Sequence, residues 1–188
     1  MKQWHDLTRA SFMVALMALS AHLQIPIGPV PITLQTMICI MTGRMLGVKW
    51  GALSMMAYGV IGLMGLPVFA GGSGPAYVLG PTFGYVVGFI PAAMIAGLLG
   101  KQIKSVWRQF LSVTTALFII YLFGVTHLYF VLTVVQDMDI HFYQALRLGV
   151  FPFLMQDFLT GLLGVYLFER VQVARQIQSR QPQGKGTK

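Results

Sequence analysis

The chain has 188 residues, of which 56% are hydrophobic and only 10% are charged, whereas soluble proteins average about 25% charged residues. A mean hydropathy of +0.71 leaves too few polar groups to cover a surface in water, so the composition excludes a soluble domain and predicts a polytopic membrane protein. The net charge of +8 is spread along the chain rather than clustered, which argues against nucleic-acid binding. The single cysteine, Cys39, excludes a disulfide scaffold.

Six apolar segments approach the length of about 20 residues that a membrane-spanning helix needs. In chain order they cover residues 8–24, 33–47, 50–66, 81–99, 110–134 and 146–168. Backbone hydrogen bonds must close within each segment in lipid, so we expect helices. The predicted fold is an all-α membrane protein with a six-helix bundle at residues 1–171. Residues 172–188 are predicted to form a basic, disordered cytoplasmic tail.

The basic residues fall on alternate ends of these segments. Twelve of the 13 lysines and arginines lie around the start of the first segment, the second–third junction, the fourth–fifth junction, or the end of the sixth, and only Arg147 lies on the other side. Cytoplasmic loops carry the excess of lysine and arginine, so we predict that both termini are cytoplasmic. As an alternative, segment 8–24, which reaches the small residues Ala18-Leu-Ser20, is a cleaved signal peptide.

Asp157 is the one acidic residue well inside a predicted span. A carboxylate at mid-span costs about 2.5–3.5 kcal/mol on insertion scales, so its side chain should face a cavity or a partner. Pro152 precedes it by about one turn and can bend the helix there. The alternative is a carboxyl that only packs against a polar neighbour on another helix.

Two uncharged loops on the outer side have unusual compositions. Residues 65–84 contain glycines and prolines that favour a shaped loop able to cap a pocket. Residues 25–31 contain three prolines, which predict an extended segment leading to Gln35. The Gln35 amide could serve a ligand or an interhelical hydrogen bond equally well.

Other motifs carry little chemistry. The four histidines and Cys39 share no metal-ligand spacing, so we predict no metal site. No nucleophile elbow or carboxylate pair is present, so we predict that the chain is not an enzyme. Ser11 and Ala15 place two small residues four apart on the first segment, a pattern that suits close helix contact, within the chain or with a partner.

Four blocks in order resemble the BioY family. They are Ile25-Pro-Ile-Gly-Pro-Val-Pro-Ile-Thr-Leu-Gln-Thr36, Gly51-Ala-Leu-Ser54, Gly65-Leu-Pro-Val-Phe-Ala-Gly-Gly72 and Gly80-Pro-Thr-Phe-Gly-Tyr85. The resemblance covers about residues 8–168. It implies a six-helix substrate-binding (S) component of an energy-coupling-factor (ECF) transporter in a prokaryotic plasma membrane. Such a subunit captures biotin from outside and works with a transmembrane coupling subunit and two cytoplasmic ATPases, which bind the ATP.

The resemblance is incomplete in the last span. The family pattern resembles Pro-Phe-Leu-Pro-Gly-Asp-x-x-Lys, whereas this chain reads Pro152-Phe-Leu-Met-Gln-Asp157 and has Thr160 at the lysine position. The resemblance therefore implies a ligand role for Asp157, and the departure leaves open an S component for another small carboxylated ligand. A structural membrane subunit is the alternative of another class.

The predicted site combines these observations, with no cofactor. The residues expected to contact the substrate are Asp157, Gln35, Gly72, Ser73, Tyr85 and Thr160. Ser11 and Ala15 are expected to form a docking face for the coupling subunit. Substrate binding is expected to order the loop 70–76 over the pocket.

Overall fold

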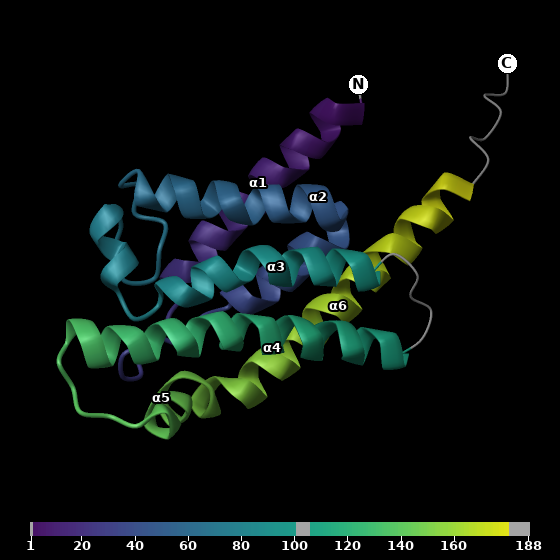
Figure 1. Cartoon of the computed structure of the whole chain (residues 1–188). Coiled ribbons are helices and arrows are strands. Elements are labelled where there is room, and N and C mark those ends of the chain that lie inside the picture. Colours follow the sequence, from purple (N-terminus) through teal and green to yellow (C-terminus); the bar gives the residue numbers. More distant parts are fainter. Residues whose placement is uncertain (1, 101–105, 181–188) are drawn as a thin grey trace, which may run out of the picture.

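The computed structural model of the chain describes residues 2–100 and 106–180, and its regular elements are helices (Figure 1). The elements in chain order are α1 (Lys2–His22), α2 (Gln35–Leu63), the 3₁₀ turn η1 (Pro75–Leu79), α3 (Phe83–Gly100), α4 (Val106–Phe130), the π-helical turn η2 (Val131–Val135), α5 (Phe142–Gly149) and α6 (Phe151–Arg180). The prediction of an all-α protein is confirmed for these residues.

Helix α2 is two helical halves joined at Gly47. This glycine has non-helical dihedral angles, with φ 78° and ψ −177°, which a residue with a side chain rarely adopts. A straight helix would hold Gln35 and Tyr58 about 34 Å apart, yet the Gln35 Nε2 atom donates a 2.7 Å hydrogen bond to the Tyr58 hydroxyl. The chain therefore turns back at Gly47, between the predicted segments 33–47 and 50–66.

The last predicted segment is also divided. Helices α5 and α6 meet at a 40° bend, and Val150 between them has non-helical φ −124° and ψ −57°. Pro152 occupies the first turn of α6, where its missing N–H breaks no helical hydrogen bond. The chain bends near Pro152 as predicted, but the break lies at Val150, ahead of the proline, rather than inside the helix.

Not every predicted span passes a test of length and hydropathy. Within the described residues, three segments are long and apolar enough to cross a membrane, namely α2, α3 and residues 107–135, and a fourth if the bent α5–α6 pair counts as one span. The count of six spans and the cytoplasmic placement of both termini stay predictions. Helix α6 continues through residue 172 to Arg180, and residues 181–188 of the predicted tail lie outside the described residues.

Small residues bring α3 into close contact with the turn of α2. Ala92, Ala93 and Ala96 are fully buried. A Cβ atom added at Gly43 would lie 2.1 Å from the Ala93 carbonyl oxygen, and one at Gly97 would lie 2.7 Å from the backbone of Gly47. Such contacts let helices pack without large side chains between them.

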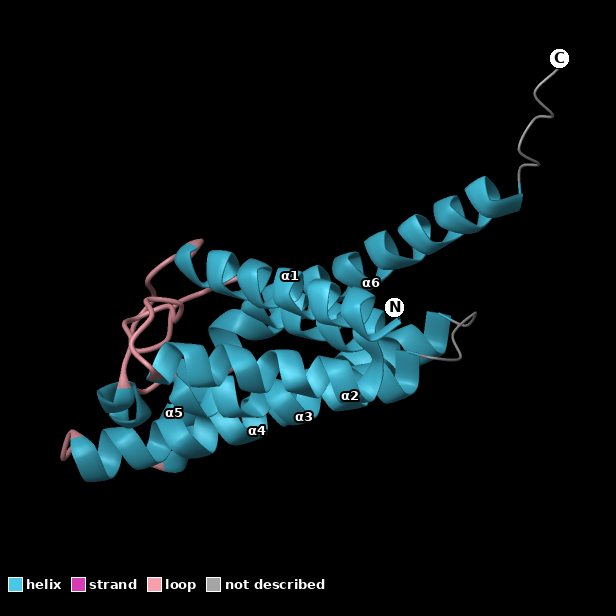
Figure 2. Cartoon of the chain, turned by 90° about the horizontal axis from the view of Figure 1, so that it is seen from above, coloured by secondary structure: helices cyan, strands magenta, loops and turns pink. Residues whose placement is uncertain are grey.

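The bundle has two different ends. The loops before α2, between α2 and α3, and before α5 gather at one end, while the start of α1 and the end of α6 lie at the other (Figure 2). Helix α3 lies between α2 and α4 (Figure 1). This arrangement places the two compositionally unusual loops side by side.

The segment 25–32 differs from its prediction. Instead of running extended, it turns back at Gly28, which has φ 65°. Ile25 and Ile32 exchange two backbone hydrogen bonds of 2.9 Å. The prolines leave few backbone donors between them, so the turn closes through the isoleucines on either side.

Candidate functional site

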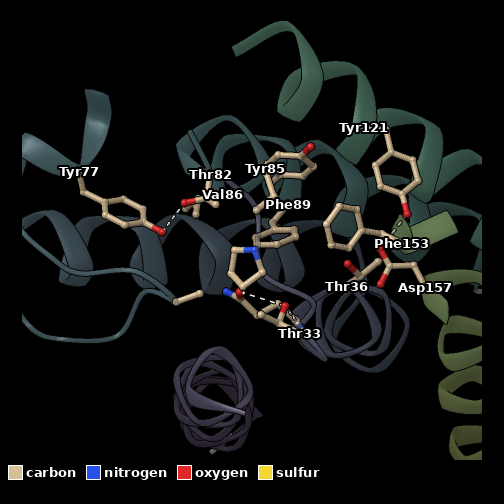
Figure 3. Close-up of a pocket in the computed structure, with 14 residues that line it drawn as sticks. Thr33, Thr36, Tyr77, Thr82, Tyr85, Val86, Phe89, Tyr121, Phe153 and Asp157 are labelled. Atoms are coloured by element: carbon tan, nitrogen blue, oxygen red, sulfur yellow. Dashed lines mark hydrogen bonds between the residues drawn. The ribbon is translucent and has the colours of Figure 1, made fainter. Parts of the chain in front are cut away.

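A cavity of about 50 Å³ lies near the loop end of the bundle (Figure 3). Its walls come from the segment before α2, the start of α2, the loop between α2 and α3, and helices α3, α4 and α6. The lining residues are Val30, Pro31, Thr33, Gln35, Thr36, Ala70, Tyr77, Thr82, Tyr85, Val86, Phe89, Tyr121, Phe153 and Asp157.

One end of this inner cavity is formed by Asp157, whose side chain is 6% exposed. The Tyr121 hydroxyl donates a 2.8 Å hydrogen bond to Oδ2 of Asp157, and Thr36 lies beside the carboxyl (Figure 3). A carboxylate has about four acceptor positions, of which Tyr121 occupies one and the Thr36 hydroxyl a second. This end can therefore accept hydrogen bonds from further N–H or O–H groups.

Gln35 forms part of the wall and is held at both ends of its amide. Its Nε2 atom donates to the Tyr58 hydroxyl, and its Oε1 atom accepts a 3.2 Å hydrogen bond from the Thr33 hydroxyl. Both the ligand and the interhelical interpretation of Gln35 are thus compatible with its position, since it lines the cavity and joins the two halves of α2.

The middle of the inner cavity is aromatic. Phe89 and Phe153 lie between the two ends, next to Tyr85 (Figure 3). The Tyr85 hydroxyl donates a 2.8 Å hydrogen bond to the carbonyl oxygen of Gly149. Tyr85 therefore contributes its ring to the wall, while its hydroxyl is engaged with the α5–α6 junction.

The opposite end is closed by Tyr77 and Thr82, whose side-chain oxygens are 2.5 Å apart. Burial raises the pKa of the Tyr77 phenol. Beyond this pair lies an outer cavity of about 430 Å³, lined by Gly72 and Ser73 and also by Tyr77 and Thr82. The Tyr77–Thr82 pair therefore separates the inner cavity from the outer one.

The described residues contain no group of three or more His, Cys, Asp or Glu side chains that could hold a metal ion. The polar groups of the inner cavity are a carboxyl, an amide and several hydroxyls, which suit hydrogen bonding to an organic ligand.

Comparisons with known proteins identify the chain. The model of the BioY family matches residues 1–177. The chain belongs to the BioY family.

Similar proteins cover nearly the same length. The probable biotin transporter BioY of Pyrococcus horikoshii is 37% identical over 168 residues, which span 89% of this chain and 96% of that protein. The biotin transporter BioY of Thermotoga maritima is 38% identical over 168 residues, spanning 89% and 95%. A crystal structure of the S-component for biotin from an ECF-type ABC transporter matches with a TM-score of 0.67 and 32% identity, covering 91% of this chain and 92% of that one.

In this BioY-family chain, the structure brings some predicted site residues together and leaves others apart. Asp157, Gln35 and Tyr85 line the inner cavity, whereas Gly72 and Ser73 line the outer one.

Thr160 lines neither cavity. Its hydroxyl donates to the backbone oxygens of Gln156 at 2.9 Å and Asp157 at 3.3 Å. Thr160 and Asp157 are three residues apart on α6 and therefore lie on a similar side of the helix. The Asp157 side chain lines the inner cavity, whereas the Thr160 hydroxyl bonds to the helix backbone.

Ser11 and Ala15 lie on the surface of the BioY-family fold. Both are exposed on α1, while Met13 and Met17 on the same helix are buried. Ser11 and Ala15 are therefore not buried by other described residues, and their role in docking stays a prediction.

Several lining residues were missed from sequence. Thr36, Tyr77, Thr82 and Tyr121 all present hydroxyls at the ends of the inner cavity. Thr36 and Thr82 fall within the blocks that resemble the family, and Tyr77 lies between two of those blocks, which is a signal that could have found them. Tyr121 lies in the apolar run Ile119-Ile-Tyr-Leu122. Its hydroxyl among apolar neighbours is the one sequence signal that could have identified it.

Proposed function

We propose that this BioY-family chain is the biotin-binding S component of an ECF-type ABC transporter. The named relatives are biotin transporters, and the similar crystal structure is that of an S-component for biotin. The observation that carries the proposal is the buried Asp157 carboxyl at the end of a cavity with aromatic walls. The protein performs binding and transport rather than catalysis.

The two ends of the inner cavity match the two polar ends of biotin. The ureido ring of biotin presents N–H donors, which suit the free acceptor positions of Asp157. Its sulfur-containing ring and aliphatic chain suit the aromatic middle at Phe89 and Phe153. The carboxylate at the other end of biotin suits hydroxyl donors, so we place it toward Tyr77 and Thr82.

The inner cavity must enlarge to admit the ligand. Its volume of about 50 Å³ is well below the roughly 300–1,000 Å³ of typical small-molecule sites. The Tyr77–Thr82 pair is the partition that faces the outer cavity, and it belongs to the loop between α2 and α3. Biotin therefore enters through the outer cavity by displacing this loop, and the loop 70–76 orders over the bound ligand.

The proposed topology has six spans with both termini in the cytoplasm. The six are α1, the two halves of α2, α3, α4 and the α5–α6 pair. The distribution of basic residues supports this orientation, which places the loop end and its two cavities outside the cell. The location is the plasma membrane of a prokaryote.

Transport requires partner subunits. The sequence carries no phosphate-binding loop, so we assign ATP hydrolysis to two separate cytoplasmic ATPases joined by a transmembrane coupling subunit. Ser11 and Ala15 supply small, exposed residues on α1 for contact with that coupling subunit. No cofactor is needed by the chain itself.

Calorimetric titration of the detergent-purified chain with biotin tests the proposal directly. We expect saturable binding with one biotin per chain, and native mass spectrometry of the untreated protein should detect a co-purified mass equal to biotin. Absence of biotin binding would contradict the proposal.

A second candidate function is an S component for another small carboxylated molecule. It is favoured by Gln156 and Thr160, which differ from the family pattern described above. A co-purified molecule whose mass differs from that of biotin, and which an excess of biotin does not displace, would support this alternative.

A further inference from the structure

Tyr58 lies outside both cavities, yet it contacts the residues that shape them. Its side chain is fully buried in the second half of α2. Its hydroxyl accepts the 2.7 Å hydrogen bond from Nε2 of Gln35 and donates a 2.9 Å hydrogen bond to the carbonyl oxygen of Val68. Gln35 lines the inner cavity, and Val68 belongs to the loop that separates α2 from α3.

A phenol has a single proton, so these two hydrogen bonds determine each other. Because the Tyr58 proton is given to the Val68 carbonyl, the phenol oxygen can only accept from Gln35. Gln35 must then turn its NH₂ group toward Tyr58 and its carbonyl oxygen toward Thr33, which donates to it at 3.2 Å. The orientation of a cavity-lining amide is thereby set by a residue that does not touch the cavity.

The ring of Tyr58 provides a second connection. It packs edge-on against Phe69, with centroids 5.4 Å apart, and Phe69 stacks on Tyr77 at 4.4 Å. Tyr77 closes the inner cavity toward the outer one. The loop is further tied to α2 by a 2.8 Å hydrogen bond from the Gly74 N–H to the Gly62 carbonyl.

A purely structural role would not require the hydroxyl. Burying a phenol oxygen costs free energy unless it is hydrogen-bonded, and phenylalanine would fill the same space. Both of the bonds that satisfy this oxygen lead to elements of the ligand site.

We propose that Tyr58 is a positioning residue for the substrate. It holds the Gln35 amide in one orientation and couples that orientation to the loop at Val68, so that the donor and acceptor pattern of the cavity wall depends on the closed loop. The inference rests on the proposed function for the identity of its ligand, and its effect on the loop is independent of any ligand.

Tyr58→Phe removes the hydroxyl and keeps the ring contact with Phe69. We expect it to weaken biotin binding about three- to tenfold, the effect of one lost hydrogen bond. Tyr166→Phe is the matched control, since the Tyr166 hydroxyl accepts a hydrogen bond from Arg170 on the exposed surface of α6. The control should leave the dissociation constant within about twofold of the unchanged chain.

A double-mutant cycle separates positioning from general packing. If Tyr58 acts through the amide, adding Tyr58→Phe to Gln35→Met should change biotin affinity by less than about twofold. The proposal would be overturned if Tyr58→Phe lowered biotin affinity by the same factor in the unchanged chain and in the Gln35→Met variant. Unchanged affinity in the Tyr58→Phe single variant would also overturn it.

Cysteine labelling tests the loop without ligand. Ser73→Cys adds a thiol at the outer cavity, while the native Cys39 is buried. We expect Tyr58→Phe, but not Tyr166→Phe, to raise the labelling rate of this thiol about threefold or more. An unchanged rate would contradict the coupling to the loop. A raised rate in a chain that fails to bind biotin would support the coupling and refute the proposed ligand.

Discussion

Asp157 owes its chemical usefulness to being satisfied only in part by the protein. The Tyr121 hydroxyl occupies one acceptor position of the carboxyl at 2.8 Å, and the Thr36 hydroxyl occupies another. The side chains that line the inner cavity include no lysine or arginine. A buried carboxyl of this kind has acceptor capacity to offer a ligand rich in N–H donors. Its neighbours are otherwise hydroxyls and aromatic rings.

Replacing this carboxyl by an amide tests that role. Asp157→Asn should weaken biotin binding by about 1–3 kcal/mol, because a charge-assisted hydrogen bond is lost and an N–H donor can face the donors of the ligand. Isothermal titration measures the change, with Asp139→Asn in the exposed loop before α5 as the control. Equal affinities of the two variants would make Asp157 a packing residue.

Thr160 should be dispensable for binding. Its hydroxyl bonds only to the backbone of its own helix, and valine has nearly the same shape. Thr160→Val is therefore expected to keep the biotin dissociation constant within about twofold, since the hydroxyl is directed to backbone oxygens and Thr160 does not line the cavity. A loss of affinity greater than about fivefold would return Thr160 to the ligand site.

At the level of residues, sequence reasoning found the groups that are rare in apolar runs. A carboxyl and an amide inside predicted spans stand out, which is why Asp157 and Gln35 could be predicted. Hydroxyls such as those of Tyr58 and Tyr121 occur in many helices and carry no such signal. Their importance comes from partners 23 and 36 residues away in sequence, and that proximity depends on how the helices are packed.

The bounds of the helices could be predicted where polar residues, glycine or proline interrupt an apolar run. Apolar runs located the helices, and Pro152 predicted the bend before α6. The reversal at Gly47 was predicted at the junction of the short segments 33–47 and 50–66, where Arg44 and Lys49 lie. Glycine alone would not have located it, because most glycines in this chain do not interrupt their helices. Relative rotation of the helices could not be predicted, since helices that are apolar on every side present no preferred face.

Gly62 in α2 illustrates how an element holds the neighbouring loop. A Cβ atom there would lie 2.1 Å from the Phe69 ring, so Gly62→Ala should displace Phe69 and lower the stability by roughly 1–3 kcal/mol through overpacking. Thermal unfolding in detergent would report this as a lower midpoint temperature.

Gly59 provides the control on the same helix. A Cβ atom at this position would meet Val86 at an ordinary 3.8 Å, so Gly59→Ala should be neutral or stabilising by up to about 1 kcal/mol. If both alanine variants unfolded at the same temperature, the contact between Gly62 and Phe69 would not hold the loop.

For the whole molecule, the position of the loop end outside the cell is the central prediction. In intact cells, a membrane-impermeant maleimide should label Ser73→Cys and should label Gly186→Cys only after permeabilisation, because the basic residues favour cytoplasmic termini. Labelling of Gly186→Cys in intact cells would reverse the orientation and favour a cleaved first segment.

The reversal of α2 at Gly47 has a further geometric consequence. Gln35 and Tyr58 lie 11–12 residues from this turn, at the ends of two rigid arms about 17 Å long. A change of about 5° in the angle between the arms would separate their tips by about 1.5 Å, enough to break the 2.7 Å hydrogen bond between them. A subunit that bound near Gly47 could thus release the Gln35 amide by a small rotation at the far side of the membrane, without touching the cavity.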